Sequence, residues 1–373
     1  MWKRLAVVAV LVGISLPAAS QDVPQGLTEP VVLPPFDPAV ASCDPPAGLV
    51  RTLAFAQDNE REFVTGIAYG LSRAAEDRGL DYVVALAGND PRRQVEQVAG
   101  LIEGKVGSVV VSPVDPPTLA PHLQHLLATG AWVGAIVPPP ASTILNAPQY
   151  ETGRILAEAA AQHIRTVLGG RARVVLLTQD SIEFLAPRFA AMRDVLGGID
   201  GVEIVADLSP RSVDRAGGRS TMATILSVQP RVDVVLGADT VVLGALDALR
   251  DAGRLAPGQF LGGIDGEPDA VAQIRAGGPF KVSVSLNSPV FGYALGQFAA
   301  DWLDGRPVPQ GLDILPRALS AETLDAYAAD LADPAAVWAD PQRRASYLAM
   351  YGSICATSYA SYLNFPWSSE QRQ

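Results

Sequence analysis

The sequence has few of the residues that bind metals or carry acid–base catalysis. It contains 3 histidines and 2 cysteines among 373 residues. His122 and His125 have the i,i+3 spacing of a metal-binding pair, but the remaining His163 has no known proximity to them, which favours a solvated helix face. No HExxH, GxSxG or strand-following GxGxxG motif occurs. We therefore expect no metal site, no cofactor and no catalytic residues, and we expect that the protein is not an enzyme.

Positive charge is also scarce. Lys and Arg number 28 against 39 Asp and Glu, a formal net charge of −11. Such an acidic surface repels phosphate backbones, so binding to nucleic acid is not expected. After the N-terminus no stretch approaches 18 uncharged apolar residues, so membrane insertion is not expected either. The 49% of hydrophobic residues in a chain of this length instead predicts a soluble globular protein of about two domains.

The N-terminus has the pattern of a cleaved secretory signal. Lys3 and Arg4 precede an apolar run over Leu5–Pro17, and the small residues Ala18–Ser20 permit a cut before Gln21. The apolar run is too short to span a bilayer comfortably. We therefore expect an exported protein whose mature chain starts at residue 21.

The two cysteines lie near opposite ends of the mature chain, at Cys43 and Cys355. An exported chain meets oxidising conditions, which favours a Cys43–Cys355 disulfide. The alternative is two separately buried thiols. Cys43 lies within a segment, 21–49, that carries seven prolines and no helical period, so this segment is expected to be an extended arm.

From residue 50 onwards, apolar β-branched runs alternate with helical patterns, such as the face formed by Phe63, Ile67 and Leu71. This alternation predicts parallel sheets that are covered by helices on both faces. Nine strands are many for one core, and the stretch from Pro138 to Asn146 interrupts the pattern, so we expect two doubly wound α/β lobes. The expected strands are 50–56, 81–86, 107–112, 131–137, 173–178, 202–206, 232–236, 259–264 and 281–285. Ligands of such sheets bind beyond the carboxyl ends of the strands.

After the last strand pattern the alternation stops. Tyr347, Tyr351, Cys355 and Tyr359 are spaced four residues apart, which is typical of one helical face. A stripe of this kind is more often a docking surface than a cofactor site. We therefore interpret 317–373 as a helical extension that supports one lobe and does not line the cleft.

Several segments, in order, resemble the type I periplasmic binding proteins of ABC importers, in the ribose-binding-like sugar cluster. They are Val109–Asp115 (VVVSPVD), Gly237–Gly253 (GADTVVLGALDALRDAG) and Gly263–Asp269 (GIDGEPD). The resemblance covers about residues 50–312. Sugar-responsive repressors share this fold but carry a DNA-binding domain at the N-terminus, where this chain has a signal sequence and an arm, so a repressor is set aside.

The resemblance implies a two-lobed clamp whose chain crosses a hinge near Asn146, near Asn287 and near Leu312, with a small molecule closed between the lobes. It implies a periplasmic location and an inner-membrane ABC permease as partner, and we expect a monomer. A periplasmic sensor module that presents its ligand to a membrane receptor or kinase is the alternative, and an enzyme is the third reading. The expected division of the chain is 1–20 signal peptide, 21–49 arm, 50–146 and 287–312 N-terminal lobe, 147–286 and 313–316 C-terminal lobe, and 317–373 extension.

Carried over by position, the resemblance implies ligand contacts from Asn59 and Phe63, although Phe63 also begins the apolar face of its helix. Asp265 matches the family's ligand-binding aspartate, and a carboxylate there can accept two hydroxyl hydrogen bonds. Asp239 matches the acidic member of an Asn-Asp pair, but Ala238 replaces the Asn, so capping of the following helix is an alternative role for Asp239.

Asn287 falls within one residue of the family's hinge-side amide, and Gln179 and Phe184 lie in the loop that usually supplies an arginine. The expected site is therefore Asn59, Phe63, Gln179, Phe184, Asp239, Asp265 and Asn287.

Two departures from the family pattern bear on the ligand. Val137–Pro140 replaces an Asp-Arg pair, and Arg188 lies a turn beyond the loop where the family has its arginine, so the guanidinium is expected to be missing. We expect a cleft poorer in polar anchors than a pentose or hexose site, with a ligand that is sugar-like, smaller, less polar or differently charged.

Overall fold

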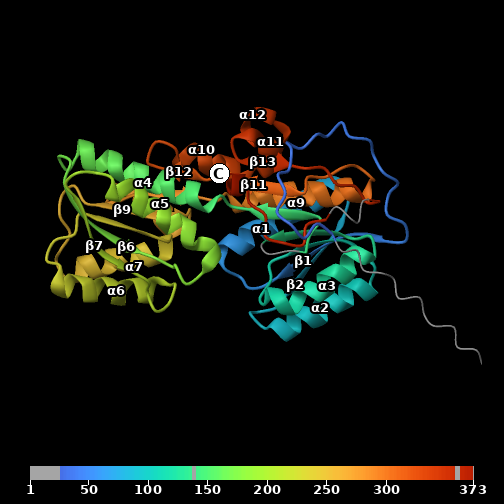
Figure 1. Cartoon of the computed structure of the whole chain (residues 1–373), viewed down its shortest axis with the longest axis horizontal. Helices are drawn as coiled ribbons and strands as arrows, with labels where there is room; N and C mark the ends of the chain where they lie inside the picture. Colours follow the sequence, from blue (N-terminus) through green and yellow to red (C-terminus); the bar gives the residue numbers. More distant parts are fainter. Residues whose placement is uncertain (1–25, 137–139, 358–361, 373) are drawn as a thin grey trace, which may run out of the picture.

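The computed structural model describes residues 26–136, 140–357 and 362–372. Within these ranges the chain forms two α/β lobes that lie side by side along the long axis of the molecule (Figure 1). The expected signal peptide, most of the proline run after residue 136, and Tyr359 lie outside the described residues. In the described ranges no helix is long and apolar enough to cross a membrane.

The N-terminal lobe contains a 7-stranded sheet in the order β13-β11-β5-β4-β3-β1-β2. Its strands are β1 (Val50–Gln57), β2 (Asp81–Leu86), β3 (Val106–Val111), β4 (Trp132–Ile136), β5 (Thr143–Asn146), β11 (Gly311–Ile314) and β13 (Leu348–Tyr351). Its helices are α1 (Glu62–Arg78), α2 (Pro91–Glu103), α3 (Pro116–Ala128) and α9 (Ser288–Leu303). Pairing is parallel from β2 through β11, and only β13 is antiparallel.

The C-terminal lobe contains a 6-stranded sheet in the order β12-β10-β9-β8-β6-β7, with β12 antiparallel at one edge. Its strands are β6 (Ala172–Leu177), β7 (Val202–Leu208), β8 (Val234–Gly237), β9 (Phe260–Asp265), β10 (Phe280–Ser285) and β12 (Arg317–Leu319). Its helices are α4 (Gln149–Thr166), η1 (Glu183–Leu185), α5 (Ala186–Gly197), α6 (Arg215–Val228), α7 (Asp239–Asp251) and α8 (Pro268–Arg275).

Each sheet is covered on both faces, as the near-continuous apolar runs predict. In the N-terminal lobe α1 packs on α9 and α2 on α3, while in the C-terminal lobe α4 packs on α5 and α6 on α7. Figure 1 shows the two helix pairs of each lobe on opposite sides of its sheet. Strand residues such as Val109–Val111 and Val174–Leu177 are almost fully buried between these layers. The fold class expected from the sequence is thus confirmed.

All nine expected strands are present, within two residues of the expected ends where those ends are described. The additional strands β5, β11, β12 and β13 have only three or four residues. Strands this short carry little periodic signal and are fixed by their pairing partners.

The chain passes between the lobes three times, at β5–α4, at β10–α9 and at β11–β12. Asn146 donates from Nδ2 to Asp313 Oδ1 at 2.7 Å, which joins the first and third crossings. The third crossing falls at 315–316, slightly after the expected Leu312, because Leu312 pairs with Leu145 inside the N-terminal sheet.

The two terminal segments are pinned together on the N-terminal lobe. Cys43 and Cys355 form a disulfide with their Cα atoms 6.0 Å apart. The backbone N–H of Cys43 also donates to the carbonyl oxygen of Gly305 at 2.8 Å. The arm contains no helix in its described residues, as expected.

The helical face expected at 347–359 is wrong within the described residues. Tyr347 follows a short helix, Tyr351 ends strand β13, and Cys355 lies beyond that strand. The four-residue spacing was overridden because β13 pairs with β11 of the N-terminal sheet. The extension does contain three short helices, α10 (Leu324–Ala332), α11 (Pro334–Ala339) and α12 (Pro341–Ala345), and its C-terminal end forms η3 (Ser369–Arg372).

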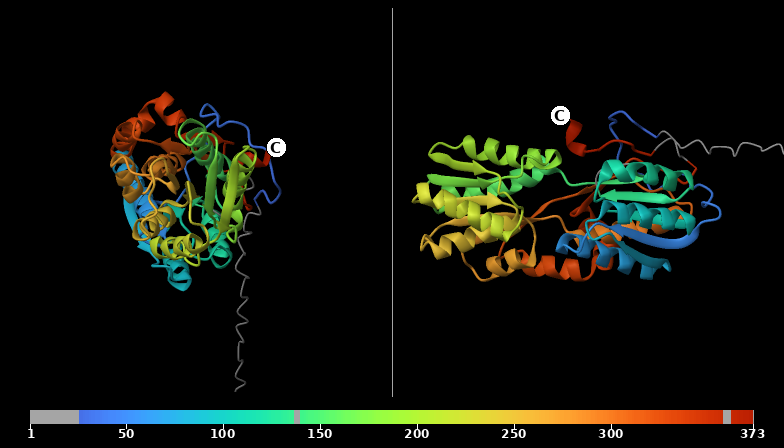
Figure 2. Two further views of the ribbon diagram at one scale, coloured as in Figure 1. Left: turned by 90° about the vertical axis from the view of Figure 1, so that its left-hand side faces the viewer. Right: turned by 90° about the horizontal axis from the view of Figure 1, so that it is seen from below.

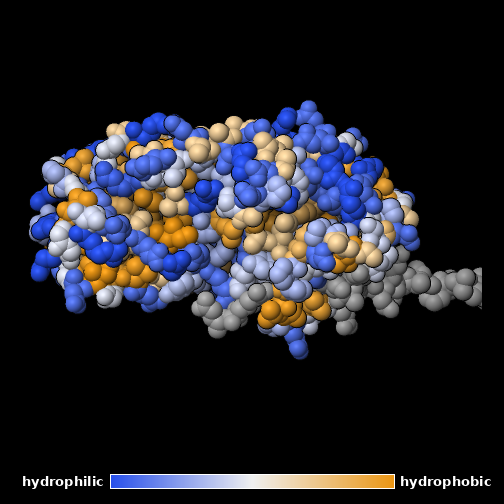
Figure 3. All heavy atoms as spheres, turned by 90° about the horizontal axis from the view of Figure 1, so that it is seen from above, coloured by the Kyte–Doolittle hydropathy of each residue, from blue (hydrophilic) through white to orange (hydrophobic). Residues whose placement is uncertain are grey.

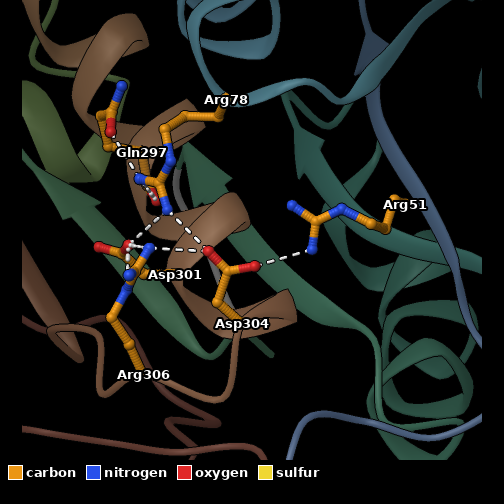
Figure 4. Close-up of polar contacts among 6 residues, drawn as sticks. All are labelled: Arg51, Arg78, Gln297, Asp301, Asp304 and Arg306. Carbon is orange, nitrogen blue, oxygen red and sulfur yellow. Dashed lines mark hydrogen bonds and ion pairs between the residues drawn. The ribbon is translucent and has the colours of Figure 1, made fainter.

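A charged cluster ties together the end of α1, the end of α9 and the start of β1. Arg78 donates to Asp301 Oδ1 at 2.9 Å and to Asp304 Oδ2 at 3.0 Å. The full cluster in Figure 4 is Arg51, Arg78, Gln297, Asp301, Asp304 and Arg306. It lies at the amino end of β1, whereas ligand sites of such sheets lie at the carboxyl ends. We therefore assign it a structural role.

Candidate functional site

The candidate site residues follow the carboxyl ends of strands in both lobes. Asp58 comes directly after β1, Gln179 follows β6, Asp239 follows β8, Asp265 ends β9, and Asn287 follows β10. The charge of Arg61, in the loop after β1, opposes the rise that burial causes in the pKa of Asp265 at the end of β9. These two parts of the lobes therefore interact electrostatically.

In the loop after β1, the side-chain amide of Asn59 is fully used by the protein. Its Nδ2 donates to Asp58 Oδ2 at 2.8 Å and to Asn89 Oδ1 at 3.0 Å. Its Oδ1 accepts from both the backbone N and Nε of Arg61, each at 3.0 Å. An amide with four hydrogen bonds has no capacity left for a ligand. Asn59 thus organises the loop.

The neighbouring Asp58 has a hydrogen-bond acceptor that the protein leaves unpaired. It is 7% exposed, and its Oδ2 accepts from Asn59 and from Arg61 Nη2. Its Oδ1 is buried and has no hydrogen-bond partner. A buried, unpaired carboxylate oxygen is costly unless a ligand or water satisfies it. Sequence reasoning chose Asn59 here and missed Asp58, although the two residues are adjacent.

Phe63 packs one side of its ring on Phe291 of α9, with ring centroids 5.6 Å apart. Phe63 is part-buried at the edge of the core, so it does belong to the apolar face of its helix. The part of the ring that stays exposed is free to contact a ligand. Phe184, in η1, is 55% exposed and has no packing role of this kind.

Asp239 does not cap α7, because Ala238 is the N-cap residue and the hydrogen bonds of the Asp239 carboxyl go to Ser283 and Glu267. It is fully buried and accepts from Ser283 Oγ at 2.6 Å and from the backbone N of Glu267 at 2.8 Å. Burial, reinforced by the Asp265 charge, raises its pKa well above the usual range. The carboxyl therefore fixes the loop that follows Asp265, which makes Asp239 a positioning residue.

Asp265 ends β9 with φ at 120°, a backbone angle that side-chain-bearing residues rarely adopt. Such strain is typical of functional sites, where the surrounding structure holds it. Burial raises the pKa of Asp265, and the guanidinium groups of Arg188 and then Arg61 oppose that rise. Asp265 is thus a part-buried carboxylate whose charge interacts with a cation of its own lobe and with one of the other lobe.

Arg188 corrects the expectation that the cleft lacks a guanidinium. It is 4% exposed, and its Nε donates to Gln149 Oε1 at 2.9 Å. Burial lowers its pKa, and the Asp265 carboxylate opposes that effect. No hydrogen bond or ion pair of its Nη atoms is found with the described residues. Its Nη donors are therefore available to a ligand beside Asp265.

Two further amides contribute unpaired atoms. Gln179 is 5% exposed, and its Nε2 donor has no partner. Asn287 is 1% exposed, adopts a left-handed backbone with φ at 54°, and donates from Nδ2 to the carbonyl oxygen of Leu315 at 3.3 Å. Its Oδ1 acceptor has no partner.

The unpaired atoms are concentrated at this site. Within the described residues, four buried side-chain polar atoms lack a hydrogen-bond partner, and three of them belong to Asp58, Gln179 and Asn287. Each of these residues follows the carboxyl end of a strand. The three supply two acceptors and one donor, and Arg188 adds further donors. This mixture suits a ligand with several hydroxyl groups.

Acidic residues flank the site. Burial and the charges of Asp265, Glu62 and Asp269 raise the pKa of Glu267 to about 7. Burial and Asp269 raise the pKa of Glu62 on the facing lobe. In the part of the chain that the structure describes, no group of His, Cys, Asp and Glu is arranged to hold a metal ion.

Residues 53–307 match the periplasmic binding protein domain family. The ribose import binding protein of Bacillus subtilis is 25% identical over 256 residues, which cover 66% of this chain and 79% of the relative. A putative rhizopine-binding protein of Rhizobium meliloti is 28% identical over 229 residues, covering 59% of this chain and 71% of the relative.

Among solved structures, a periplasmic ribose ABC transporter protein from Conexibacter woesei matches with a TM-score of 0.67 and 20% identity, covering 77% of this chain and 97% of that one. A solute-binding protein from Bacillus halodurans with bound myo-inositol matches with a TM-score of 0.64 and 20% identity, covering 76% and 99%. These matches confirm the two-lobed fold. Since the family match also spans more than half of the sequence, the chain belongs to the periplasmic binding protein domain family, with the type I fold.

Proposed function

We propose that this protein binds one sugar or polyol molecule between its lobes and delivers it to the permease of an ABC importer. The observation that supports this most is the set of unpaired buried polar atoms on Asp58, Gln179 and Asn287, which come from both lobes and from a hinge crossing. A hydroxyl group both donates and accepts, so a polyol can satisfy carboxylate, amide and guanidinium groups at once.

The relatives support the same ligand class. Two relatives are named for ribose import and rhizopine binding, and one matching structure holds myo-inositol. The charges of Arg188 and Asp265 interact in the C-terminal lobe and supply the charged pair that the sequence was expected to lack. A fork of N–H donors next to a carboxylate can hold two adjacent hydroxyl groups of one ligand.

The charge around the site restricts the ligand further. Glu62, Asp265, Glu267 and Asp269 interact electrostatically across the gap between the lobes. A ligand that carries a carboxylate or phosphate is repelled by this cluster. We therefore propose a neutral ligand in preference to a sugar acid or a sugar phosphate.

A thermal-shift screen of the chain from residue 21 onwards tests the ligand class. The panel contains D-ribose, xylitol and myo-inositol, with D-glucuronate and D-ribose 5-phosphate as charged counterparts. A ligand at 100 times its Kd stabilises a folded protein by about 2.7 kcal/mol, which shifts Tm by several degrees. We expect a shift with at least one neutral compound and none with the charged ones.

A shift by only the charged compounds contradicts the proposed charge preference. The absence of any shift with sugars and polyols, together with copurification of a ligand of another class, contradicts the proposed function. We also propose export by the N-terminal signal and periplasmic residence. Amino-terminal sequencing of the protein recovered from a periplasmic extract tests this, since it is expected to start at Gln21.

A further inference from the structure

The C-terminal extension contacts both lobes, not one. Strand β13 is part of the N-terminal sheet, and Trp338 of α11 packs on Tyr293 and Phe298 of α9 with centroid distances of 6.4 and 5.7 Å. Tyr69 of α1 also donates its hydroxyl to the carbonyl oxygen of Ala332 at 3.0 Å. These contacts fasten the extension to the N-terminal lobe.

On the other side, the extension begins with β12 in the C-terminal sheet, and α10 also contacts the C-terminal lobe. Tyr327 is 7% exposed, and its hydroxyl is hydrogen-bonded to Ser285 Oγ at the end of β10. The same Ser285 Oγ accepts from the backbone N of Asn287 at 3.1 Å, directly at the hinge crossing. An exposed ion pair joins Arg275 of α8 to Asp325 of α10 at 3.0 Å and adds little by itself.

The end of the chain makes a second connection. The ring of Trp367 lies against Gly311 of the N-terminal sheet. Glu370, three residues after Trp367, reaches the C-terminal lobe. Glu370 Oε1 accepts from the backbone N of Glu151 at 2.9 Å, and Oε2 accepts from that of Tyr150 at 3.3 Å. Helix α4 begins after Pro148 and has no cap from its own side chains. A carboxylate at a helix N-terminus satisfies free N–H groups and complements the helix dipole.

The two connections lie on different flanks of the hinge. The right-hand view of Figure 2 shows the red-orange helices of the extension along one edge of the molecule and the C-terminal end at the opposite edge. Figure 3 shows hydrophilic side chains over much of the upper surface, with smaller apolar areas between them. No hydrogen bond or ion pair directly joins 50–136 to 149–283 among the described residues, so the hinge crossings and the extension make the polar connections between the lobes.

We propose that the C-terminal extension is a strap that is fastened to both lobes on two flanks of the hinge. It holds the lobes, before any ligand binds, at the interlobe separation of this structure. A rotation of the C-terminal lobe pulls Ser285 away from Tyr327, and the first turn of α4 away from Glu370. The strap thereby restricts the open states of the clamp, and its effect does not depend on which ligand the cleft takes.

The test compares two double variants of the full mature chain. Tyr327→Phe with Glu370→Ala removes a hydroxyl and a carboxylate that reach the C-terminal lobe. Tyr347→Phe with Glu322→Ala removes the same two groups from the extension, but there the partners Asp330 and Ser320 belong to the extension itself. The second pair is therefore a matched control.

Spin labels at Val83→Cys in the N-terminal lobe and Val228→Cys in the C-terminal lobe report the interlobe distance, since both positions are exposed. Without ligand, we expect the first double variant to give a longer and broader distance distribution than the wild type. The control is expected to match the wild type. The interlobe distance is also measured in each single variant, so that the proposal can still be tested if a double variant folds poorly.

Hydrogen exchange at Tyr150 and Glu151 verifies that the cap is lost in Glu370→Ala, with an expected increase in rate of about tenfold. If that exchange accelerates while the interlobe distances of the variants stay at the wild-type values, the strap does not hold the lobes. Equal changes in the matched control would overturn the proposal in the same way, because the effect would then arise from a generally weakened extension.

Discussion

Arg188 and Asp265 oppose each other's pKa shifts inside the candidate site. Burial lowers the pKa of Arg188 and raises that of Asp265, and each charge counteracts the effect of burial on the other. The pair lies in one lobe, and Arg61 of the other lobe also acts on Asp265. We propose that a ligand bound between the lobes meets the N–H donors of Arg188 and the carboxylate acceptor of Asp265.

The pair predicts a pH dependence of ligand binding. Replacing Arg188 by Gln removes the cation that most lowers the pKa of Asp265, so that carboxyl takes up its proton at a higher pH. As pH falls from 7 to 4, affinity for the sugar or polyol found by screening should therefore decline earlier in Arg188→Gln than in the wild type. Titration calorimetry across this range measures the shift. Arg61→Gln is the control, with a smaller expected shift because Arg61 is exposed and contributes less.

A second prediction concerns Asp239. Because burial disfavours its charge, the neutral and nearly isosteric Asn should cost less than about 1 kcal/mol of unfolding free energy. Asp239→Ala leaves Ser283 and the backbone N of Glu267 without their acceptor and should cost about 1–3 kcal/mol. Urea unfolding of the two variants measures both values. Equal losses in both would show that the carboxyl does not hold the loop after Asp265.

Glu267 gives a prediction about stability and pH. Its pKa is raised to about 7 in the fold, against 4.5 ordinarily, so the folded state binds more protons and loses stability as pH rises from about 4.5 to 7. Glu267→Gln should therefore be more stable than the wild type at pH 8, by about 1 kcal/mol once solvent screening is allowed for. The difference should vanish at pH 4. Scanning calorimetry at both values checks this, and a gain that is independent of pH would contradict it.

The strand pattern and the candidate positions were predictable from the sequence, because buried parallel strands leave continuous apolar runs and their carboxyl ends are where ligands bind. Asp265 and Asn287 were chosen because their positions match the pattern of the family, and both adopt positive φ angles in the structure. The choice between Asp58 and Asn59 was not predictable, because Asn89 of another loop and Arg61 use up the hydrogen bonds of the Asn59 amide.

Two other features depend on tertiary contacts that no local pattern reveals. Arg188 lies in the first turn of α5, so its electrostatic interaction with Asp265 depends on how α5 packs in the C-terminal lobe. Tyr347 and Tyr351 have helical spacing, yet pairing with β11 makes the segment between them a strand. Local propensity is a weak guide where a sheet edge supplies the partner.

The disulfide predicts a stability loss. Cys43 and Cys355 close a loop with a sequence separation of 312, worth about 5 kcal/mol in the chain-entropy model. The Cys43→Ser, Cys355→Ser variant should therefore unfold at lower urea concentration, with the arm released from the turn at Gly305. Urea titration of the variant, with reduced wild type as control, measures the loss. Two reactive thiols in unfolded, unreduced wild type would contradict the bond.

Titration calorimetry of wild type and Asp265→Ala with the same neutral sugar or polyol tests the central claim most directly. The account predicts one molecule bound per wild-type chain, and binding about 10- to 150-fold weaker in the variant, since a hydrogen bond to a charged group is worth about 1.5–3 kcal/mol. The variant is expected to stay folded, because Asp265 is part-buried at the end of its strand and its carboxyl faces cations of both lobes. Equal affinity of the two proteins would contradict the site, and saturable binding of only anionic or apolar compounds would contradict the ligand class.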